Sequence, residues 1–221
     1  MTQPVKKACV FCGSSFGKDE TYAEQASELG KQMAERNWGL VYGGGSTGLM
    51  GSVARGCATN GGYVHGIIPD ALINKERVDD KELNAKLKEG IDNHDGSTPI
   101  PDSKEYGKTT LVKDMHTRKR MMGEESDFFI ALPGGYGTLE ELMEVTTWFQ
   151  LNIHKKPIVI FNMNGFYDNF LKFINDCITS EFVSVKNGEI LRVANTIEEV
   201  FQAIDTFEQP DGVFNLKWES T

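Results

Sequence analysis

The sequence predicts a doubly wound α/β fold, a parallel β-sheet with helices on both faces, in a single domain of 221 residues. Three observations lead to this prediction. Short apolar segments alternate with helical segments along the whole chain, no internal repeat interrupts the alternation, and glycine-rich turns follow several apolar segments. The composition, 39% hydrophobic and 25% charged, is that of a globular domain with a sizeable core.

The elements can be assigned in order from these patterns. Strands buried on both faces of a parallel sheet are apolar throughout, so strands are expected where apolar runs are short and continuous. These runs lie at residues 8–11, 40–42, 63–68, 127–132, 158–161 and 190–193. Helices are expected between the strands, where apolar residues recur at helical spacing. These segments lie at residues 20–36, 49–59, 110–125, 139–151, 167–179 and 197–207.

Two segments depart from the alternation. Residues 79–108 are polar, rich in Asp, Glu and Lys, and too long for an ordinary connection, so we expect a surface insertion with a turn at residues 92–96. Residues 209–221 have no clear period, and their apolar side chains are expected to dock on the body of the protein. The expected organisation is one domain over residues 1–221 with this insertion and this tail.

Composition limits the partners and the compartment. A net charge of −9 and a pI near 5.0 argue against a nucleic-acid duplex or an anionic membrane as partner. No apolar run approaches the roughly 20 residues that span a bilayer. The first residues lack the apolar core of a signal peptide, so a cytoplasmic location with reduced thiols is expected.

The cysteines and histidines predict no metal site. Cys9 and Cys12 form a C-x-x-C, but the two residues between them are apolar, as in a buried strand. No second C-x-x-C or suitably spaced histidine pair completes a zinc site. Buried structural thiols are therefore expected.

Three glycine-bearing turns follow predicted strands, at residues 13–17, 43–48 and 134–137. Ligands of parallel sheets bind beyond the carboxyl ends of the strands. The three turns are therefore expected to line one crevice.

The second turn has the form of a dinucleotide fingerprint. Gly43, Gly45 and Gly48 spell G-x-G-x-x-G, and Asp70 follows after the next strand. The fingerprint normally follows the first strand, whereas this one follows the second, so a tight turn with close helix packing or a turn lining some other nucleotide is an alternative to NAD. Leu49 stands where a P-loop would carry lysine, which argues against P-loop ATP hydrolysis.

The third turn is the most informative feature of the chain. It lies between an apolar strand and an amphipathic helix, and the first turn of that helix carries Glu140 and Glu141. Glycines let backbone N–H groups approach a ligand, and a helix N-terminus attracts anions, so a phosphate is expected here with a glutamate one turn away. The alternative for Glu141 is a capping box with Thr138. Glu140 points about 100° away from Glu141, so the two are not automatically a catalytic pair.

The preceding predicted helix carries an arginine among apolar residues. Leu111, Met115, Arg118 and Met122 recur at helical spacing on one face. Arg118 is interpreted either as a structural or snorkelling side chain or as a guanidinium that reaches the crevice to bind phosphate or carboxylate. Met115 is expected against a ligand ring, and Lys119 on a solvated face.

Several long segments together resemble the LONELY GUY (LOG) family, often described as lysine decarboxylase-like proteins. The resemblance covers roughly residues 6–180, and the chain is identified as a fungal-type member with an insertion. The matching segments are residues 9–15, 41–51, 115–119, 133–141, 147–148 and 153–157.

The resemblance implies a Rossmann-like fold, a homodimer, no metal and no organic cofactor. The implied reaction is hydrolysis of the N-glycosidic bond of an N6-modified AMP, such as a cytokinin riboside 5′-monophosphate, to the free base and ribose 5-phosphate. Arg118 and Glu141 are the implied catalytic residues. The implied substrate-binding residues are Gly44, Ser46, Glu76, Met115, Arg118, Lys119, Gly134, Gly135, Tyr136, Gly137, Thr138, Leu139, Glu140 and Thr147.

The chemistry leaves some alternatives open. Glu141 is expected to stabilise the oxocarbenium-like ribose or to activate water, and Arg118 either to stabilise the leaving base or to hold the phosphate. The insertion, absent from shorter members, leaves the N6 substituent open, so salvage or clearance of purine monophosphates is an alternative. A non-catalytic nucleotide-binding protein and an NAD-dependent oxidoreductase are the competing classes. Lysine decarboxylation is disfavoured because the expected crevice offers only Lys119 as a Schiff-base lysine.

Overall fold

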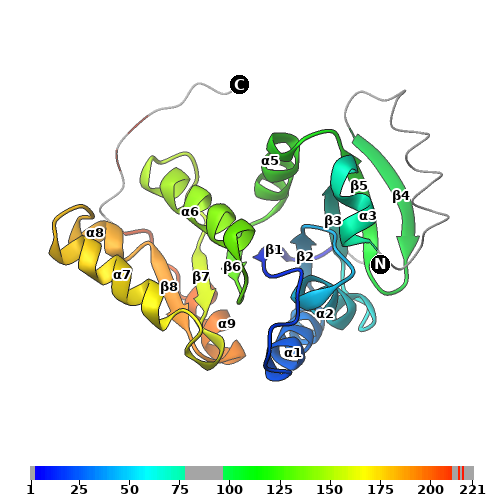
Figure 1. The fold of residues 1–221 in the computed structure, drawn as a ribbon, viewed down its shortest axis with the longest axis horizontal. Coiled ribbons are helices and arrows are strands. Elements are labelled where there is room, and N and C mark those ends of the chain that lie inside the picture. The colour runs from blue at the N-terminus through cyan, green and yellow to red at the C-terminus, as the bar shows by residue number, and fades with distance from the viewer. Residues whose placement is uncertain (1–2, 78–96, 211–213, 215, 217–221) are drawn as a thin grey trace. The chain divides into compact units, whose positions relative to one another are not determined.

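The computed structural model describes residues 3–77, 97–210, 214 and 216, which fall into two compact units (Figure 1). The first unit is Met1–Asp127 and the second is Phe128–Thr221. Each unit contains parallel strands joined by helices, as the sequence predicts. The turn expected at residues 92–96 lies outside the described residues.

The first unit contains a sheet in the order β4-β5-β3-β2-β1. Its strands are β1 (Lys6–Phe11), β2 (Trp38–Tyr42), β3 (Val64–Pro69), β4 (Ser97–Ser103) and β5 (Gly107–Val112). All pairs are parallel except β4 with β5, which is antiparallel. Strands β2 and β3 are buried over their whole length, which fits their largely apolar residues; the exception is His65 of β3.

Helices cover both faces of this sheet (Figure 1). They are α1 (Thr21–Glu35), α2 (Gly48–Ala58), the short η1 (Asp70–Leu72) and α3 (Ile73–Glu76), and α5 (Met115–Glu125). Helices α1 and α2 pack on each other through glycines: a Cβ on Gly30 would meet the backbone at Val53, and one on Gly56 would meet the backbone at Ser27. Helix α5 crosses β1, β2, β3 and β5 on the opposite face.

The second unit contains three parallel strands in the order β6-β7-β8. They are β6 (Phe128–Ala131), β7 (Ile158–Phe161) and β8 (Leu191–Ala194). Its helical segments are α6 (Tyr136–Gln150), η2 (Met163–Gly165), α7 (Asp168–Thr179), α8 (Val185–Gly188) and α9 (Ile197–Asp205). The core is formed by fully buried side chains of β6 and β7 together with Leu142 and Phe149 of α6.

The tail contacts the second unit at the end of α6. The backbone N–H of Phe214 donates to the Gln150 carbonyl at 3.0 Å, and the Asn152 side chain donates to the Leu216 carbonyl at 3.1 Å. The side chains of Phe214 and Leu216 are about half exposed, and both hydrogen bonds use backbone atoms of the tail. The other apolar residues of the tail lie outside the described residues.

Two sequence-based assignments were wrong around residue 110. Part of the segment expected as a surface insertion forms strand β4 and the beginning of β5. The helix expected at residues 110–125 begins only at Met115, because Thr110–Val112 extend β5 beside β3. Leu111 therefore packs with Ile68 and Ile73 and does not share a helix face with Arg118.

Replacing Gly30 by Ala should destabilise the protein, because the new methyl group would overlap the α2 backbone. We expect a loss of about 1–3 kcal/mol in the free energy of unfolding, measured by urea denaturation. Gly137→Ala is the matched control, since it also replaces a helical glycine but its Cβ would have no neighbour within 4 Å. Equal stability losses in the two variants would contradict the packing argument.

Candidate functional site

Two glycine turns of the first unit meet at the carboxyl ends of β1 and β2. The Gly13 carbonyl accepts hydrogen bonds from the N–H groups of Leu49, at 3.0 Å, and Met50, at 3.3 Å. The Thr47 hydroxyl donates to the Ser14 carbonyl at 3.1 Å. The structure thus brings together two of the three turns expected to line a crevice, and the third lies in the second unit.

Two glycines of the second turn are required by close packing: Gly48, which belongs to the fingerprint, and Gly44, which does not. Gly48 has a φ of +60°, and a Cβ there would overlap the backbone at Ser14. Gly44 has a φ of +78° and lies against Ile68. In the first turn of α2, the N–H groups of Leu49 and Met50 already donate to the Gly13 carbonyl. The N-terminus of α2 is therefore not a ready phosphate site. The arrangement matches the tight-turn alternative and gives no support to a dinucleotide site.

Arg118 lies on α5 and reaches the second turn. Asp114 caps the helix by accepting from the Thr117 N–H at 2.8 Å, and the hydrogen bonds from Thr117 lower the pKa of Asp114. One turn later, the Arg118 side chain is 5% exposed, its Nη2 donates to the Gly43 carbonyl at 3.2 Å, and its Nη1 contacts the Met115 sulfur at 3.8 Å. Arg118 therefore does not snorkel to solvent but reaches the turn that follows β2.

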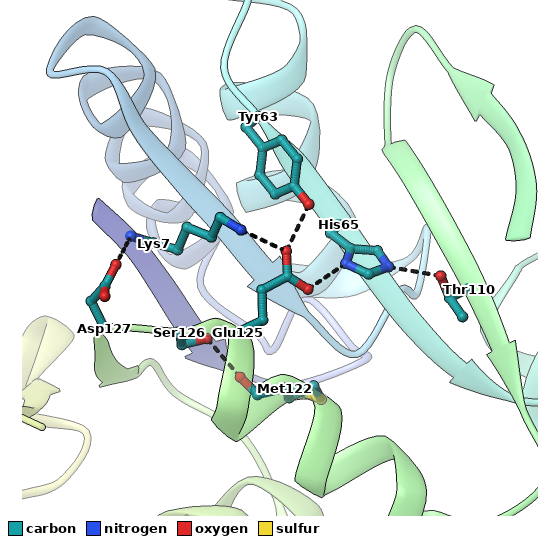
Figure 2. Close-up of polar contacts among 8 residues, drawn as sticks. All are labelled: Lys7, Tyr63, His65, Thr110, Met122, Glu125, Ser126 and Asp127. Atoms are coloured by element: carbon teal, nitrogen blue, oxygen red, sulfur yellow. Dashed lines mark hydrogen bonds and ion pairs between the residues drawn. The ribbon is translucent and has the colours of Figure 1, made fainter. Parts of the chain in front are cut away.

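The other end of α5 is held by a polar cluster, which Figure 2 shows around the Glu125 carboxylate. One carboxylate oxygen accepts from the Tyr63 hydroxyl at 2.6 Å and the Lys7 ammonium at 3.1 Å. The other lies 2.6 Å from Nδ1 of His65, whose Nε2 lies 2.8 Å from the Thr110 hydroxyl. The cluster therefore ties α5 to β1, β3 and β5.

The charge on Glu125 is stabilised by these neighbours. Burial alone would raise its pKa, but hydrogen bonds from His65 and Tyr63 and the positive charge available nearby bring the pKa down to about 2. An ionised carboxylate only accepts hydrogen bonds, so Nδ1 of His65 carries a hydrogen. The carboxylate is thus ionised throughout the neutral range.

The third glycine turn, in the second unit, leads into α6. The helix begins at Tyr136 with Gly135 as N-cap, one turn earlier than expected, so the capping-box alternative for Thr138 and Glu141 is wrong. Within the described part of the chain, the N–H groups of Tyr136, Gly137 and Thr138 donate to no protein acceptor. A Cβ on Gly135 or Gly137 would have no described neighbour within 4 Å. Neither glycine is explained by packing, and a ligand has room to approach these amides.

The carboxylates of α6 differ in exposure. Glu141 is half-buried at the border of the buried helix face formed by Thr138, Leu142 and Val145, whereas Glu140 is exposed. Thr147 is also exposed, and its hydroxyl donates to the Met143 carbonyl at 2.8 Å. Glu141 is thus the carboxylate better shielded from water.

The other predicted site residues fall in varied surroundings. Ser46 and Gly44 are buried in the second turn, Lys119 is half-buried on α5, and Met115 is 40% exposed. Tyr136 is 95% exposed, and Leu139 and Gly134 are half-buried. Glu76 ends α3, and its side chain lies outside the described part of the chain.

The thiols of the C-x-x-C are buried, as predicted. Cys9 and Cys12 are buried and form no disulfide, and burial raises the pKa of Cys57 to about 12. Among the described residues, no group of three or more His, Cys, Asp or Glu side chains is arranged to hold a metal ion. In the same part of the chain, no helix is long and apolar enough to cross a membrane.

Sequence reasoning missed the cluster that holds α5. The sequence patterns assign no role to His65 or Glu125. A signal was present, because Arg118, Met122 and Glu125 are spaced by four and three residues and share one helix face. A carboxylate on a face that is otherwise buried requires partners, and they come from strands far away in the sequence.

Features that suit a phosphorylated compound are found in each unit taken by itself. In the second unit, the open amides of α6 suit an anion, and Glu141 offers a partly shielded carboxylate. In the first unit, Arg118 supplies a buried guanidinium at the exit of β2.

Known sequences bear on this chemistry. A profile of the family described as "Possible lysine decarboxylase" matches residues 50–204. The chain is 41% identical over 216 residues to "Cytokinin riboside 5′-monophosphate phosphoribohydrolase LOG5" of Arabidopsis thaliana, covering 97% of this chain and 84% of that protein. It is also 41% identical to "Probable cytokinin riboside 5′-monophosphate phosphoribohydrolase LOGL6" of Oryza sativa subsp. japonica, covering 97% and 77%.

Solved structures share the fold. The Moco carrier protein of Chlamydomonas reinhardtii superposes with a TM-score of 0.60 at 20% identity, over 92% of this chain and 96% of that one. The molybdenum cofactor binding protein of Rippkaea orientalis gives 0.60 at 19% identity, over 93% and 98%. At these identities the likeness establishes the α/β fold and nothing about the ligand.

The Glu125 cluster predicts an acid-sensitive contribution to stability. The pKa of Glu125 in the folded protein, about 2, is below the ordinary value of 4.5. The contribution of Glu125 to the free energy of unfolding is therefore complete above pH 4.5 and is lost as the pH falls towards 2. The difference in unfolding free energy between wild type and Glu125→Gln should therefore shrink by roughly 1–2 kcal/mol between pH 6 and pH 3 in urea titrations. A difference that stays constant over this range would contradict the assignment.

Proposed function

The chain belongs to the family described as "Possible lysine decarboxylase", the LONELY GUY family of the relatives above, and on that premise we propose that it is a phosphoribohydrolase. The proposed reaction is hydrolysis of the N-glycosidic bond of adenosine 5′-monophosphates, including N6-modified ones such as cytokinin riboside 5′-monophosphates. The products are the free base and ribose 5-phosphate. The sequence resemblance and the relatives agree on this chemistry.

The observation that carries the proposal is the N-terminus of α6. Three successive amides have no protein acceptor in the described part of the chain, and the glycines beside them have no packing role there. The helix is 15 residues long, so its dipole adds to the attraction for an anion. We assign the 5′-phosphate of the substrate to this turn.

The reaction needs little besides positioning and charge. As the bond from ribose C1′ to the base nitrogen breaks, positive charge develops on the ribose and the electron pair leaves with the base. Water adds to C1′ and loses a proton, and the base gains one. We assign Glu141 to the ribose, where its carboxylate stabilises the cationic sugar and accepts the proton from water.

Arg118 is the second proposed catalytic residue. Its cationic guanidinium would either stabilise the departing base or hold the phosphate, and the contact with Gly43 is compatible with both roles. We further propose a cytoplasmic homodimer that needs no cofactor and whose partner is a small-molecule nucleoside monophosphate rather than nucleic acid or membrane.

Base release should depend on the 5′-phosphate. Purified protein is incubated with AMP, N6-isopentenyl-AMP and the corresponding nucleosides, and free base is measured by chromatography. The nucleosides should have a kcat/KM lower by about 10²-fold or more, because they lack the group that positions the sugar. Release from neither nucleotide, with AMP still bound in calorimetry, would indicate a binding protein instead.

Substitutions at the proposed phosphate-binding turn and at Glu141 should change different kinetic parameters. Gly137→Ala places a methyl group where the phosphate approaches, so KM should rise about tenfold or more while stability is kept. Glu141→Gln removes the charge that meets the ribose, so kcat should fall by about 10²–10³-fold. Glu144→Gln on the same helix is the control and should change neither parameter by more than about twofold. A Glu141→Gln protein with wild-type kcat would refute the catalytic assignment.

A further inference from the structure

The geometry of α5 points to a function for a residue that the proposed chemistry does not use. Arg118 and Glu125 are seven residues apart, which places them on one helix face about 10 Å apart along the axis. Arg118 contacts the turn after β2, and Glu125 contacts side chains of β1 and β3, the latter joined to β5. A shift of α5 at one end therefore moves the other.

Apolar packing does little to fix the orientation of this helix. Met122 is the only fully buried apolar side chain of α5, all of whose residues the structure describes, and burial of a single methionine is not directional. The directional contacts are polar. The Glu125 carboxylate accepts from three side chains, the N–H of Lys7 donates to the Asp127 carboxylate at 2.7 Å, and the N–H of Asp127 donates to the Lys7 carbonyl at 2.8 Å.

We propose that Glu125 is a positioning residue, which sets the rotation of α5 through Tyr63, His65 and Lys7 and thereby orients the Arg118 guanidinium for the reaction. This inference rests on the proposed function. A helix rotation of about 10° moves a side-chain tip that lies about 6 Å from the axis by about 1 Å. A misplacement of that size can cost about 10²-fold in rate.

The cluster is a fixed support rather than a switch. Because the pKa of Glu125 is near 2, its carboxylate stays ionised at any pH at which the enzyme would work. The Lys7 ammonium also lies over the Tyr63 ring, 4.8 Å from its centroid, which restricts two of the three partners of the carboxylate. The orientation of α5 is thus held by mutually restrained groups.

The test is a double-mutant cycle between Glu125 and Arg118, with kcat and KM measured for AMP. Glu125→Ala should lower kcat/KM by about 10–100-fold in the wild-type background and by less than about twofold in the Arg118→Ala background. Glu125→Gln, which keeps the shape and most hydrogen bonds, should restore activity to within about fivefold of wild type. Additive losses in the cycle would overturn the proposal.

Two controls separate positioning from loss of stability. Glu124→Ala removes an exposed carboxylate of the same helix, and Leu29→Ala creates a cavity in α1 without touching α5. When kcat is measured well below the melting temperature of each variant, neither substitution should reduce it. If Glu125→Ala fails to fold, Tyr63→Phe removes one hydrogen bond to the carboxylate and should give a smaller loss that again vanishes in the Arg118→Ala background. If Glu125→Ala, or Tyr63→Phe in its place, lowered kcat no more than Leu29→Ala does, the proposal would be overturned.

A spectroscopic readout is independent of catalysis. The NMR signal of the Arg118 Nε–Hε group is assigned by its disappearance in Arg118→Lys. It should shift in Glu125→Ala and stay in place in Glu124→Ala. If wild-type protein releases no base, the proposed function fails, while this signal still reports whether Glu125 orients Arg118. An unchanged signal in Glu125→Ala would overturn the positioning role whatever the reaction.

Discussion

The hydrogen bonds of the half-buried Glu125 carboxylate are the interactions on which the placement of α5 in the first unit depends. The carboxylate gathers hydrogen bonds from a lysine of β1, a tyrosine beside β3 and a histidine of β3 that itself contacts β5. Helix α5 has little apolar surface of its own to bury, so this carboxylate determines how the helix lies across the sheet. Its sequence partner on the same face, Arg118, is carried to the exit of β2 as a consequence.

The glycines of the chain have two different roles. Gly48, Gly30 and Gly56 allow backbone segments to approach more closely than a Cβ permits, and Gly43 and Gly44 leave room for the side chains of Arg118 and Ile68. Gly135 and Gly137 have no such role among the described residues, and the amides beside them are open. This contrast separates glycines that build the scaffold from glycines that suit a phosphate, which a motif alone does not do.

Much of the fold could be predicted from the sequence because the central strands are continuously apolar and are separated by amphipathic helices. The errors arose where local signals competed. Thr110 to Val112 suit a helix or a strand, and only pairing with β3 decides between them. For the site, the glycine turn before α6 was evident from its residues, whereas the capping box at Thr138 was misread because the helix starts earlier, at Tyr136. The partners of Glu125 are separated from it by 60 to 118 residues, so no local pattern reveals them.

The central claim is that the turn before α6 binds the phosphate of a nucleoside monophosphate and places its ribose beside Glu141. The most direct test is a crystal structure of the Glu141→Gln variant with AMP. We expect the phosphate oxygens within hydrogen-bond distance of the amides of residues 136–138, with the anomeric carbon facing the substituted side chain at position 141. A phosphate bound at residues 43–48, or a base on the α6 turn, would contradict it.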